Sequence, residues 1–363
     1  MKRVVLTGGG TGGHIMPGIS LAECLASRGV EVLWIGSEGG MEREIVTKRG
    51  IRYEDSGMKR VSSGLFRGPR RAVMALAALP SARSKLRAFA ADAVIGLGGY
   101  ASVPTLLAAR FCRIPYFLLE QNAIPGKVSR WFAPKAKRVY SQFVEARNYF
   151  AKRVVFEHTG SPVRREIIEH LRGASAQDPG KGDVVLVLGG SQGSKSVNKI
   201  FRESLPSLEL EFPGLRVHHV AGAQDYDETV AAYSGRVGHK VYSFCNEMHV
   251  LLSEATVAVA RAGAVTLAEL AIAGIPAVLI PYPYAADNHQ AANAEVYRRA
   301  GAAKVIGPSE FNATKLITSM RELLHDPVAR EKAIAAMKSF GRPNAAEDIV
   351  NSVFCSLQQD RKD

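Results

Sequence analysis

KRVVLTGGGTGGH (2–14) is a short β-branched, apolar run followed at once by a glycine-rich loop. The segment behind it, PGISLAECLASRG (17–29), has the apolar spacing of an amphipathic helix and ends on glycine, a common helix stop. EVLWIG (31–36) then supplies a second strand-like run. Alternating buried strands and helices are typical of a parallel sheet that is covered by helices on both faces. The opening stretch therefore predicts a doubly wound α/β fold.

The same alternation recurs along the rest of the chain. Further apolar runs lie at 92–100, 114–122, 137–143, 183–194, 215–222, 239–245, 255–263 and 275–283. Residues 160–183 are instead polar and rich in small residues, as in a linker. Since 363 residues exceed one ordinary core, we expect two Rossmann-like, doubly wound domains, 1–160 and 161–340, with a C-terminal helix (341–358) that packs back on the first.

Composition excludes several classes of protein. With 47% hydrophobic and 22% charged residues, the chain is globular rather than disordered. The four cysteines form no CxxC pair, which argues against a zinc ribbon or a disulfide scaffold. No run approaches the ~18 apolar residues of a spanning helix, and the N-terminus reads as a strand rather than a signal peptide. We expect a protein that is soluble or rests on a membrane surface.

The positive charge is confined to the first half. Residues 1–160 contain 25 Lys and Arg against 11 Asp and Glu, a net charge of +14; the remainder contains 22 against 23, and the sum is +13. A stretch without acids, 56–91, surrounds the apolar run AVMALAAL (72–79) with cations, and KVSRWFAPKAKR (127–138) is also basic. Cations beside apolar groups favour an anionic membrane surface, whereas nucleic acid favours stacking aromatics. A solvated face over a core helix is the structural alternative.

Glycine clusters follow four of the expected strands: Gly8–Gly13, Gly96–Gly99, Gly189–Gly193 and Gly263. Ligands of open parallel sheets bind beyond the carboxyl ends of the strands, where glycine lets the backbone approach an anion. Four clusters in two domains predict two nucleotide-type folds that face one another across a cleft. The spacing of the first cluster also matches a dinucleotide fingerprint, and an NAD-dependent oxidoreductase would then need Glu38 to bind the ribose.

His14 and Glu269 are the candidate chemical groups. His14 directly follows the first glycine loop, so it is either a solvated loop histidine or a general base that a helix N-terminus keeps neutral. Glu269 lies three residues after Thr266, so it either completes a capping box or accepts ribose hydroxyls. We expect the segment 264–269 to begin a helix whose backbone meets a phosphate.

Two further groups of polar residues have structural alternatives. Asp287, His289, Gln290 and Asn293 suit sugar hydroxyls or a polar helix cap. Asp225-Tyr226-Asp227 is a D-x-D triplet, but its setting favours acids at a helix N-terminus, and we expect no protein-bound metal. Arg164 is placed to reach a pyrophosphate or to remain on the surface.

Seven motifs, in order between residues 2 and 350, resemble those of the MurG family, the peripheral-membrane N-acetylglucosaminyltransferases of peptidoglycan synthesis. They are GGGTGGHIMPG (8–18), GLGGYASVP (96–104), LEQNAIPG (119–126), GSPVR (160–164), GGSQGS (189–194), RAGAVTLAEL (261–270) and DNHQAANA (287–294). The resemblance implies a GT-B fold. It also implies transfer of GlcNAc from UDP-GlcNAc to the C4 hydroxyl of MurNAc in undecaprenyl-diphospho-MurNAc-pentapeptide (lipid I), which gives β-1,4-linked lipid II with inversion. The alternative is another GT-B glycolipid synthase.

The resemblance also implies partners and a location. The enzyme would need no cofactor and would act at the cytoplasmic face of the inner membrane, bound peripherally to the anionic surface. Cell-wall and division proteins would be its partners, and nucleic acid would not. The first domain would bind the acceptor and the membrane, and the second domain UDP-GlcNAc.

Family roles carry over by position. His14 matches the proposed catalytic base. The residues that match substrate contacts are Thr11, Gly12, Gly13, Asn122, Arg164, Ser191, Cys245, Ala264, Val265, Thr266, Leu267, Ala268, Glu269 and Gln290. The chain departs from the family pattern at Leu119, where histidine is usual, and at His289, which replaces the first of two glutamines.

Overall fold

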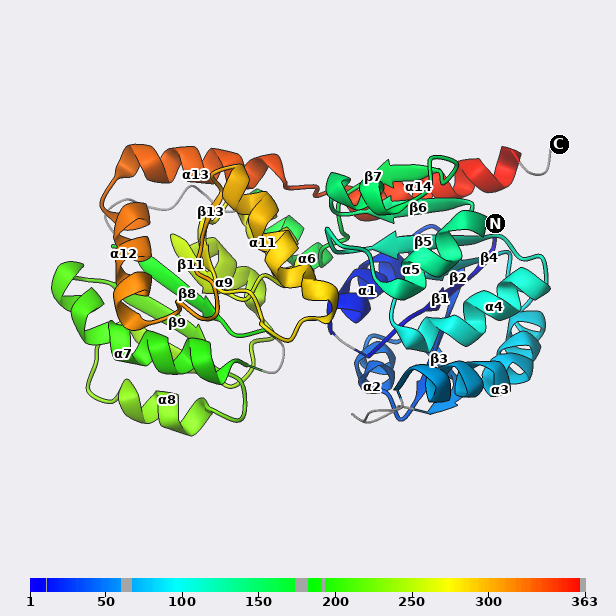
Figure 1. Cartoon of the computed structure of the whole chain (residues 1–363), viewed down its shortest axis with the longest axis horizontal. Coiled ribbons are helices and arrows are strands. Elements are labelled where there is room, and N and C mark those ends of the chain that lie inside the picture. The colour runs from blue at the N-terminus through cyan, green and yellow to red at the C-terminus, as the bar shows by residue number, and fades with distance from the viewer. Residues whose placement is uncertain (11, 60–66, 174–181, 191–192, 360–363) are drawn as a thin grey trace. The chain divides into compact units, whose positions relative to one another are not determined.

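The structure is a computed structural model that describes residues 1–10, 12–59, 67–173, 182–190 and 193–359, with the backbone alone at 67–71. The chain divides into two compact units (Figure 1). The first unit is Met1–Arg164 with Pro343–Asp363, and the second is Arg165–Arg342. Each unit contains one parallel sheet with helices on both faces, so the predicted α/β class with two doubly wound domains is confirmed.

The sheet of the first unit has seven strands in the order β3-β2-β1-β4-β5-β6-β7, and every pairing is parallel. They are β1 (Arg3–Thr7), β2 (Glu31–Glu38), β3 (Arg52–Lys59), β4 (Ala93–Gly96), β5 (Tyr116–Glu120), β6 (Arg138–Ser141) and β7 (Phe156–His158). The chain runs outward from β1 to β3 and then returns to place β4 beside β1. The strand order therefore reverses between β1 and β4, where ligands of such sheets bind.

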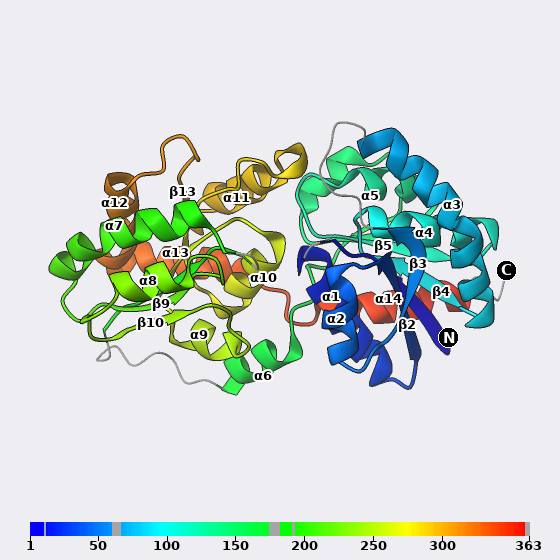
Figure 2. The same ribbon diagram turned by 90° about the horizontal axis from the view of Figure 1, so that it is seen from below.

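Two helical layers enclose this sheet (Figure 2). One consists of α3 (Arg67–Ala88), α4 (Val103–Phe111) and α5 (Lys127–Phe132), and the other of α1 (Gly12–Ala26), α2 (Met41–Lys48) and α14 (Ala345–Gln359). Leu33 of β2 packs in the core beneath α3, and its neighbour Trp34 packs in the core beneath α1. Because both faces are covered, the middle of the strand, residues 32–36, is an uninterrupted apolar run, as its sequence indicated.

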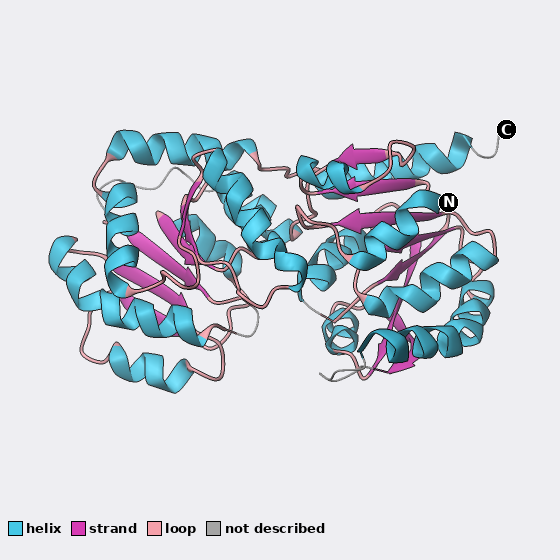
Figure 3. Ribbon diagram, in the orientation of Figure 1, coloured by secondary structure: helices cyan, strands magenta, loops and turns pink. Residues whose placement is uncertain are grey.

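The sheet of the second unit has the order β10-β9-β8-β11-β12-β13, again parallel (Figure 3). Its strands are β8 (Val184–Leu188), β9 (Arg216–Val220), β10 (His239–Tyr242), β11 (Val257–Ala260), β12 (Ala277–Leu279) and β13 (Ala303–Val305). Its helices are α6 (Arg165–Gly173), α7 (Lys195–Glu211), α8 (Tyr226–Ala232), α9 (Met248–Glu254), α10 (Ala264–Ala273), α11 (His289–Arg299), α12 (Ala313–Leu324) and α13 (Pro327–Ser339). Here the order reverses between β8 and β11.

Short 3-10 turns complete the described elements: Tyr100–Ser102, Ala133–Lys135, Val144–Tyr149 and Ala286–Asn288. All four predicted glycine clusters follow strands at the two reversal points, β1 and β4 in one sheet and β8 and β11 in the other. None of the described helices is long and apolar enough to cross a bilayer.

Candidate active site

Three loops of the first unit pack together beyond β1, β4 and β5. A Cβ on Gly8 would lie 2.8 Å from the Cβ of Leu97, and one on Gly99 would lie 2.7 Å from the Gly9 carbonyl oxygen. The Gln121 side chain donates to the Leu97 carbonyl oxygen over 3.1 Å. Loop 8–14, loop 96–100 and loop 120–126 are therefore held together, and only close backbone approach lets the first two meet.

His14 is the third residue of α1 and lies between the first two loops. Its Nδ1 is 3.2 Å from the Gly9 carbonyl oxygen. Because a carbonyl oxygen only accepts, Nδ1 carries the hydrogen in this bond and Nε2 carries the lone pair of the neutral ring. A Cβ on Gly98, whose φ is +96°, would lie 3.0 Å from the ring's Cδ2 and 3.1 Å from Nε2. The arrangement fits a base that accepts a proton at Nε2.

The other predicted residues of the first loop have different outcomes. Thr11 lies outside the described residues. Gly12 and Gly13 begin α1, so their amides are among those that have no partner within the helix. The Gly10 amide donates over 3.2 Å to Glu42 at the start of α2, a contact that no sequence pattern had indicated.

Asn122 is held by Glu120, the last residue of β5. One carboxylate oxygen accepts from the Asn122 amide at 3.0 Å and from its side chain at 3.3 Å, and the other accepts from the Gly126 amide at 3.0 Å. Glu120 is only 3% exposed. Sequence reasoning selected Asn122 and missed Glu120. The signal was available, because a carboxylate at the end of an otherwise apolar buried strand needs donors there.

In the second unit, Arg261 joins the ends of three strands. Its Nη2 donates to the hydroxyls of Ser194 and Ser196, both at 2.8 Å, and its Nη1 donates to the Ile280 carbonyl oxygen at 3.1 Å. Burial lowers the pKa of this guanidinium from its ordinary value. Arg261 thus holds the turn into α7 against the residues after β11 and β12. Sequence reasoning missed this role, and Ser191, which it had selected nearby, lies outside the described residues.

Helix α10 begins three residues after this arginine, and the capping-box interpretation of its sequence is wrong. Its N-cap is Gly263, without a side-chain cap, and Thr266 is already the third residue of the helix. Glu269 follows one turn later and is 7% exposed. The amides of the first turn have no partner within the helix itself, which is the arrangement of a phosphate-binding helix start. The other predicted residues also lie in α10: Ala264, Val265, Leu267 and Ala268.

The predicted polar residues in the first turns of α11 differ in their surroundings. Gln290 accepts through its Oε1 from the Tyr282 amide at 2.9 Å, which leaves its NH₂ group as the donor toward any sugar. Asn293 is fully buried and donates to the Ala262 carbonyl oxygen at 3.2 Å. The expectation of a sugar contact is therefore wrong for Asn293, which secures the turn that precedes α10.

Cys245 and Arg164 are both half-buried, the first after β10 and the second at the end of the first unit.

The acids of the D-x-D triplet lie at a helix N-terminus, as the sequence analysis favoured. Asp225 is the N-cap of α8 and is buried, and its carboxylate accepts from Asn198 at 2.8 Å. Among the described residues, no three of His, Cys, Asp and Glu gather as a metal site would require.

The basic stretch of the first unit combines a core helix face with an exposed one. Ala78 and Leu86 of α3 are buried, whereas Val73 and Leu76 are 66% and 59% exposed. Lys85 donates to the Asp55 carbonyl oxygen, so it is not a loose surface cation. One side of α3 therefore packs in the core, and the other side carries exposed apolar residues; the membrane-surface interpretation stays a prediction.

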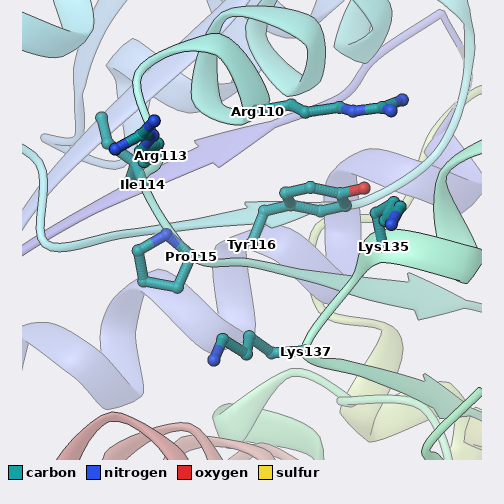
Figure 4. Close-up of a pocket in the computed structure, with 7 residues that line it drawn as sticks. All are labelled: Arg110, Arg113, Ile114, Pro115, Tyr116, Lys135 and Lys137. Carbon is teal, nitrogen blue, oxygen red and sulfur yellow. The ribbon is translucent and has the colours of Figure 1, made fainter. Parts of the chain in front are cut away.

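A cationic pocket of about 540 Å³ lies where β5 begins (Figure 4). The three loops follow the other ends of the strands, so the pocket and the loops lie at opposite ends of the sheet. Tyr116, the first residue of β5, lies at its centre, and its hydroxyl donates to the Phe132 carbonyl oxygen at 2.9 Å. Burial raises the pKa of Tyr116 to about 12. The remaining lining residues are Arg110, Arg113, Ile114, Pro115, Lys135 and Lys137. The pocket carries four cations and no acid.

Two family descriptions match the chain. "Glycosyltransferase family 28 N-terminal domain" matches residues 4–141, and "Glycosyltransferase family 28 C-terminal domain" matches residues 184–349.

Full-length relatives carry one name. A protein of Geobacter metallireducens is 37% identical over 370 residues, covering 99% of this chain and 100% of the relative. A protein of Geobacter sulfurreducens is 37% identical over 366 residues, again covering 99% and 100%. Both are called UDP-N-acetylglucosamine–N-acetylmuramyl-(pentapeptide) pyrophosphoryl-undecaprenol N-acetylglucosamine transferase. The solved structure of Acinetobacter baumannii MurG is 30% identical with a TM-score of 0.79, covering 97% of this chain and 98% of that one.

Proposed function

The chain belongs to glycosyltransferase family 28 and, within it, to the MurG group, and we propose that it transfers GlcNAc from UDP-GlcNAc to the C4 hydroxyl of MurNAc in lipid I. The product is lipid II, the β-1,4-linked disaccharide precursor of peptidoglycan. The observation that carries the proposal is the paired placement of loops: each unit has its glycine loops at the reversal point of its own sheet, one beside His14 and the other beside α10.

Transfer with inversion is a single displacement at the anomeric carbon of GlcNAc. The bond from the MurNAc C4 oxygen to that carbon forms as the bond to the UDP oxygen breaks. The C4 hydroxyl must lose its proton, and UDP departs with an additional negative charge. The reaction therefore needs at least one general base and one set of donors that stabilises the charge of the departing diphosphate.

His14 is the base in this proposal. Its Nδ1 is directed at the Gly9 carbonyl oxygen, so Nε2 takes the C4 proton and the ring becomes imidazolium. The protonated ring keeps the same Nδ1–H bond, so no rearrangement is needed during the step. Gly12, Gly13 and Asn122, all on the loops around His14, position the sugars.

The second unit supplies most of the donor contacts in this proposal. The amides at the start of α10 and the side chain of Arg164 receive the charge of the departing diphosphate. The Glu269 carboxylate accepts from the ribose hydroxyls, and the NH₂ group of Gln290 donates to GlcNAc. The remaining donor contacts are assigned to Thr11, Ser191, the Cys245 backbone and the residues Ala264, Val265, Thr266, Leu267 and Ala268.

We propose that the step uses no metal or other cofactor. Of the two D-x-D acids that could bridge a metal to the diphosphate, Asp225 is buried at the N-cap position of α8 and accepts from Asn198. Amide and guanidinium groups supply the positive potential instead.

The first unit also meets the membrane in this proposal. The exposed apolar residues of its α3–α5 layer include Val73, Leu76, Phe111 and Trp131, the last two 63% and 61% exposed. The cationic pocket lies at the end of the same layer. Apolar groups beside cations bind an anionic bilayer, each cation contributing ~1 kcal/mol near the headgroups. We place this contact at the cytoplasmic leaflet, where UDP-GlcNAc and cell-wall and division proteins are met, and assign no role to nucleic acid.

An acceptor panel tests the proposed activity. Purified protein in detergent is given UDP-GlcNAc with a soluble lipid I analogue or with diacylglycerol, and the products are identified by mass spectrometry. We expect GlcNAc on the MurNAc acceptor alone. Transfer to diacylglycerol and not to the lipid I analogue would replace the proposal with a different glycolipid synthase.

A further inference from the structure

A second carboxylate, buried behind the first glycine loop, sets the position of that loop. Glu42 is the second residue of α2 and is fully buried. Its Oε1 accepts from the Ser37 amide at 2.9 Å and from the Ser37 hydroxyl at 2.5 Å, and its Oε2 accepts from the Gly10 amide at 3.2 Å. Among the described residues it has no cationic partner. Three donors from the end of β2 and from the loop satisfy it instead.

The surrounding backbone is shaped around this carboxylate. A Cβ on Gly9 or on Gly40 would overlap the Glu42 carboxylate, so neither position tolerates a side chain while Glu42 keeps its place. Tyr53 of β3 donates to the Ser37 carbonyl oxygen at 2.8 Å and so fixes the other side of the anchor. Removing a carboxylate from water costs free energy, and hydrogen-bond donors must offset that cost. The donors around Glu42 therefore hold its carboxylate in one position.

We infer that Glu42 is a positioning residue for the His14 base, an inference that rests on the proposed function only where it treats His14 as that base. The connection is two hydrogen bonds long. Glu42 holds the Gly10 amide, and the preceding carbonyl oxygen, that of Gly9, accepts from His14 Nδ1. Gly9 O and Gly10 N belong to one planar peptide unit. Fixing that amide therefore fixes the direction of the carbonyl that selects the histidine tautomer.

Glu42→Gln tests this connection with one atom changed. The amide oxygen takes the side with the two Ser37 donors, and the NH₂ group then faces the Gly10 amide, donor against donor. We expect kcat to fall at least tenfold while KM for UDP-GlcNAc changes much less, since most of the proposed donor contacts lie on the second unit. Tyr53→Phe is the matched control, because it removes a bond from the same anchor and leaves the Gly10 contact intact.

The tautomer of His14 is the readout that a merely structural role would not move. Wild-type protein labelled with ¹⁵N-histidine should show His14, assigned by its loss in His14→Gln, with Nδ1 protonated. Glu42→Gln should shift that signal toward the Nε2-protonated form, and Tyr53→Phe should not.

Two results would overturn the inference. One is an Nε2-protonated His14 in the wild-type protein, which needs no variant to fold. The other is equal loss of kcat in Glu42→Gln and Tyr53→Phe at equal loss of thermal stability. If the wild-type protein has no lipid I activity, the proposed function fails, but the tautomer measurement still decides whether Glu42 positions the ring.

Discussion

His14 Nδ1 lies 3.2 Å from the carbonyl oxygen of Gly9, five residues earlier in the chain. The bond connects the first glycine loop to the first turn of α1. Because Nδ1 carries the hydrogen, Nε2 is the basic nitrogen of the neutral ring. The loop that was expected to hold an anion therefore also orients a proton acceptor.

His14→Gln should lower kcat by roughly 10²–10⁴, the usual contribution of a general base. Glutamine can still donate to Gly9 but cannot take up a proton, so the loop and the affinity for UDP should be retained. Steady-state kinetics with a lipid I analogue and calorimetry with UDP measure the two quantities. A variant that keeps at least half of the wild-type kcat would show that another group is the base.

Glu269→Gln should raise KM for UDP-GlcNAc by about 10- to 100-fold, because a hydrogen bond to a charged group contributes ~1.5–3 kcal/mol. The affinity for UDP should fall in parallel, since the ribose belongs to both ligands. Asp227→Asn, which removes an exposed acid from α8 of the same unit, is the control and should change neither value. Unchanged UDP affinity in Glu269→Gln would remove the ribose assignment.

Gly98→Ala should reduce kcat more than its cost in stability explains. Its φ of +96° costs an alanine about 1–2 kcal/mol, and the new Cβ would press on the His14 ring. Gly29→Ala has a similar φ of +73° but no atom within 4 Å of the added Cβ. Melting temperatures of the two variants should be similar while only Gly98→Ala loses turnover; equal turnover would mean that the ring is not confined there.

Stability of the second unit should fall as the pH is lowered from about 6.5 toward 3. Burial, with a smaller effect of Arg202, lowers the pKa of His219 to about 3, and the ring bonds Tyr233 and Asn198 at 2.8 and 3.0 Å. In that window the unfolded state binds a proton that the folded state does not, so this residue contributes a slope of roughly 1.4 kcal/mol per pH unit, with stability rising as pH rises.

Urea unfolding at several pH values measures that slope. His219→Gln should be less stable at pH 7 and should show a shallower pH dependence between 6.5 and 4. A slope identical to that of the wild-type protein would mean that other groups cause the acid sensitivity.

Arg113→Gln combined with Lys135→Gln should weaken binding to anionic vesicles by about 30-fold, since two cations contribute ~2 kcal/mol at a charged surface. The pair Arg298→Gln and Arg299→Gln removes the same charge from exposed positions of the second unit and should have little effect. Sedimentation with vesicles that contain anionic phospholipid gives both values. Equal weakening by the two pairs would indicate a general charge effect rather than a surface on the first unit.

The sequence predicted the parts of the fold that have a strong local pattern. Strands buried on both faces are continuous apolar runs, and the runs that contain β1 and β8 end in glycine, so their positions and the loops after them were recognisable. β3 was missed because it is an edge strand: RYEDSGMK buries only Ser56 and Met58. The short strands β7 and β13 carry too few residues to form a pattern.

The site was predictable only where a local sequence pattern marked a residue. His14 and Glu269 could be selected because each follows a glycine loop or helix start. Glu42 and Arg261 hold those loops through partners that are mostly far away in the sequence, and a single chain gives no local sign of such contacts. Glu120 is different, because its partners Asn122 and Gly126 are near in the sequence and its place at the end of a buried strand could have indicated its role. At Thr266 the sequence instead suggested a contact that the structure lacks. The S/T-x-x-E spacing from Thr266 to Glu269 is present, but Thr266 is not the N-cap that this spacing usually indicates.

The placement of the donor is the central claim, and a crystal structure with UDP-GlcNAc tests it most directly. The account predicts the diphosphate at the first turn of α10, with the ribose hydroxyls within hydrogen-bond distance of the Glu269 carboxylate. A nucleotide bound instead at loop 8–14 of the first unit, with α10 unoccupied, would contradict it.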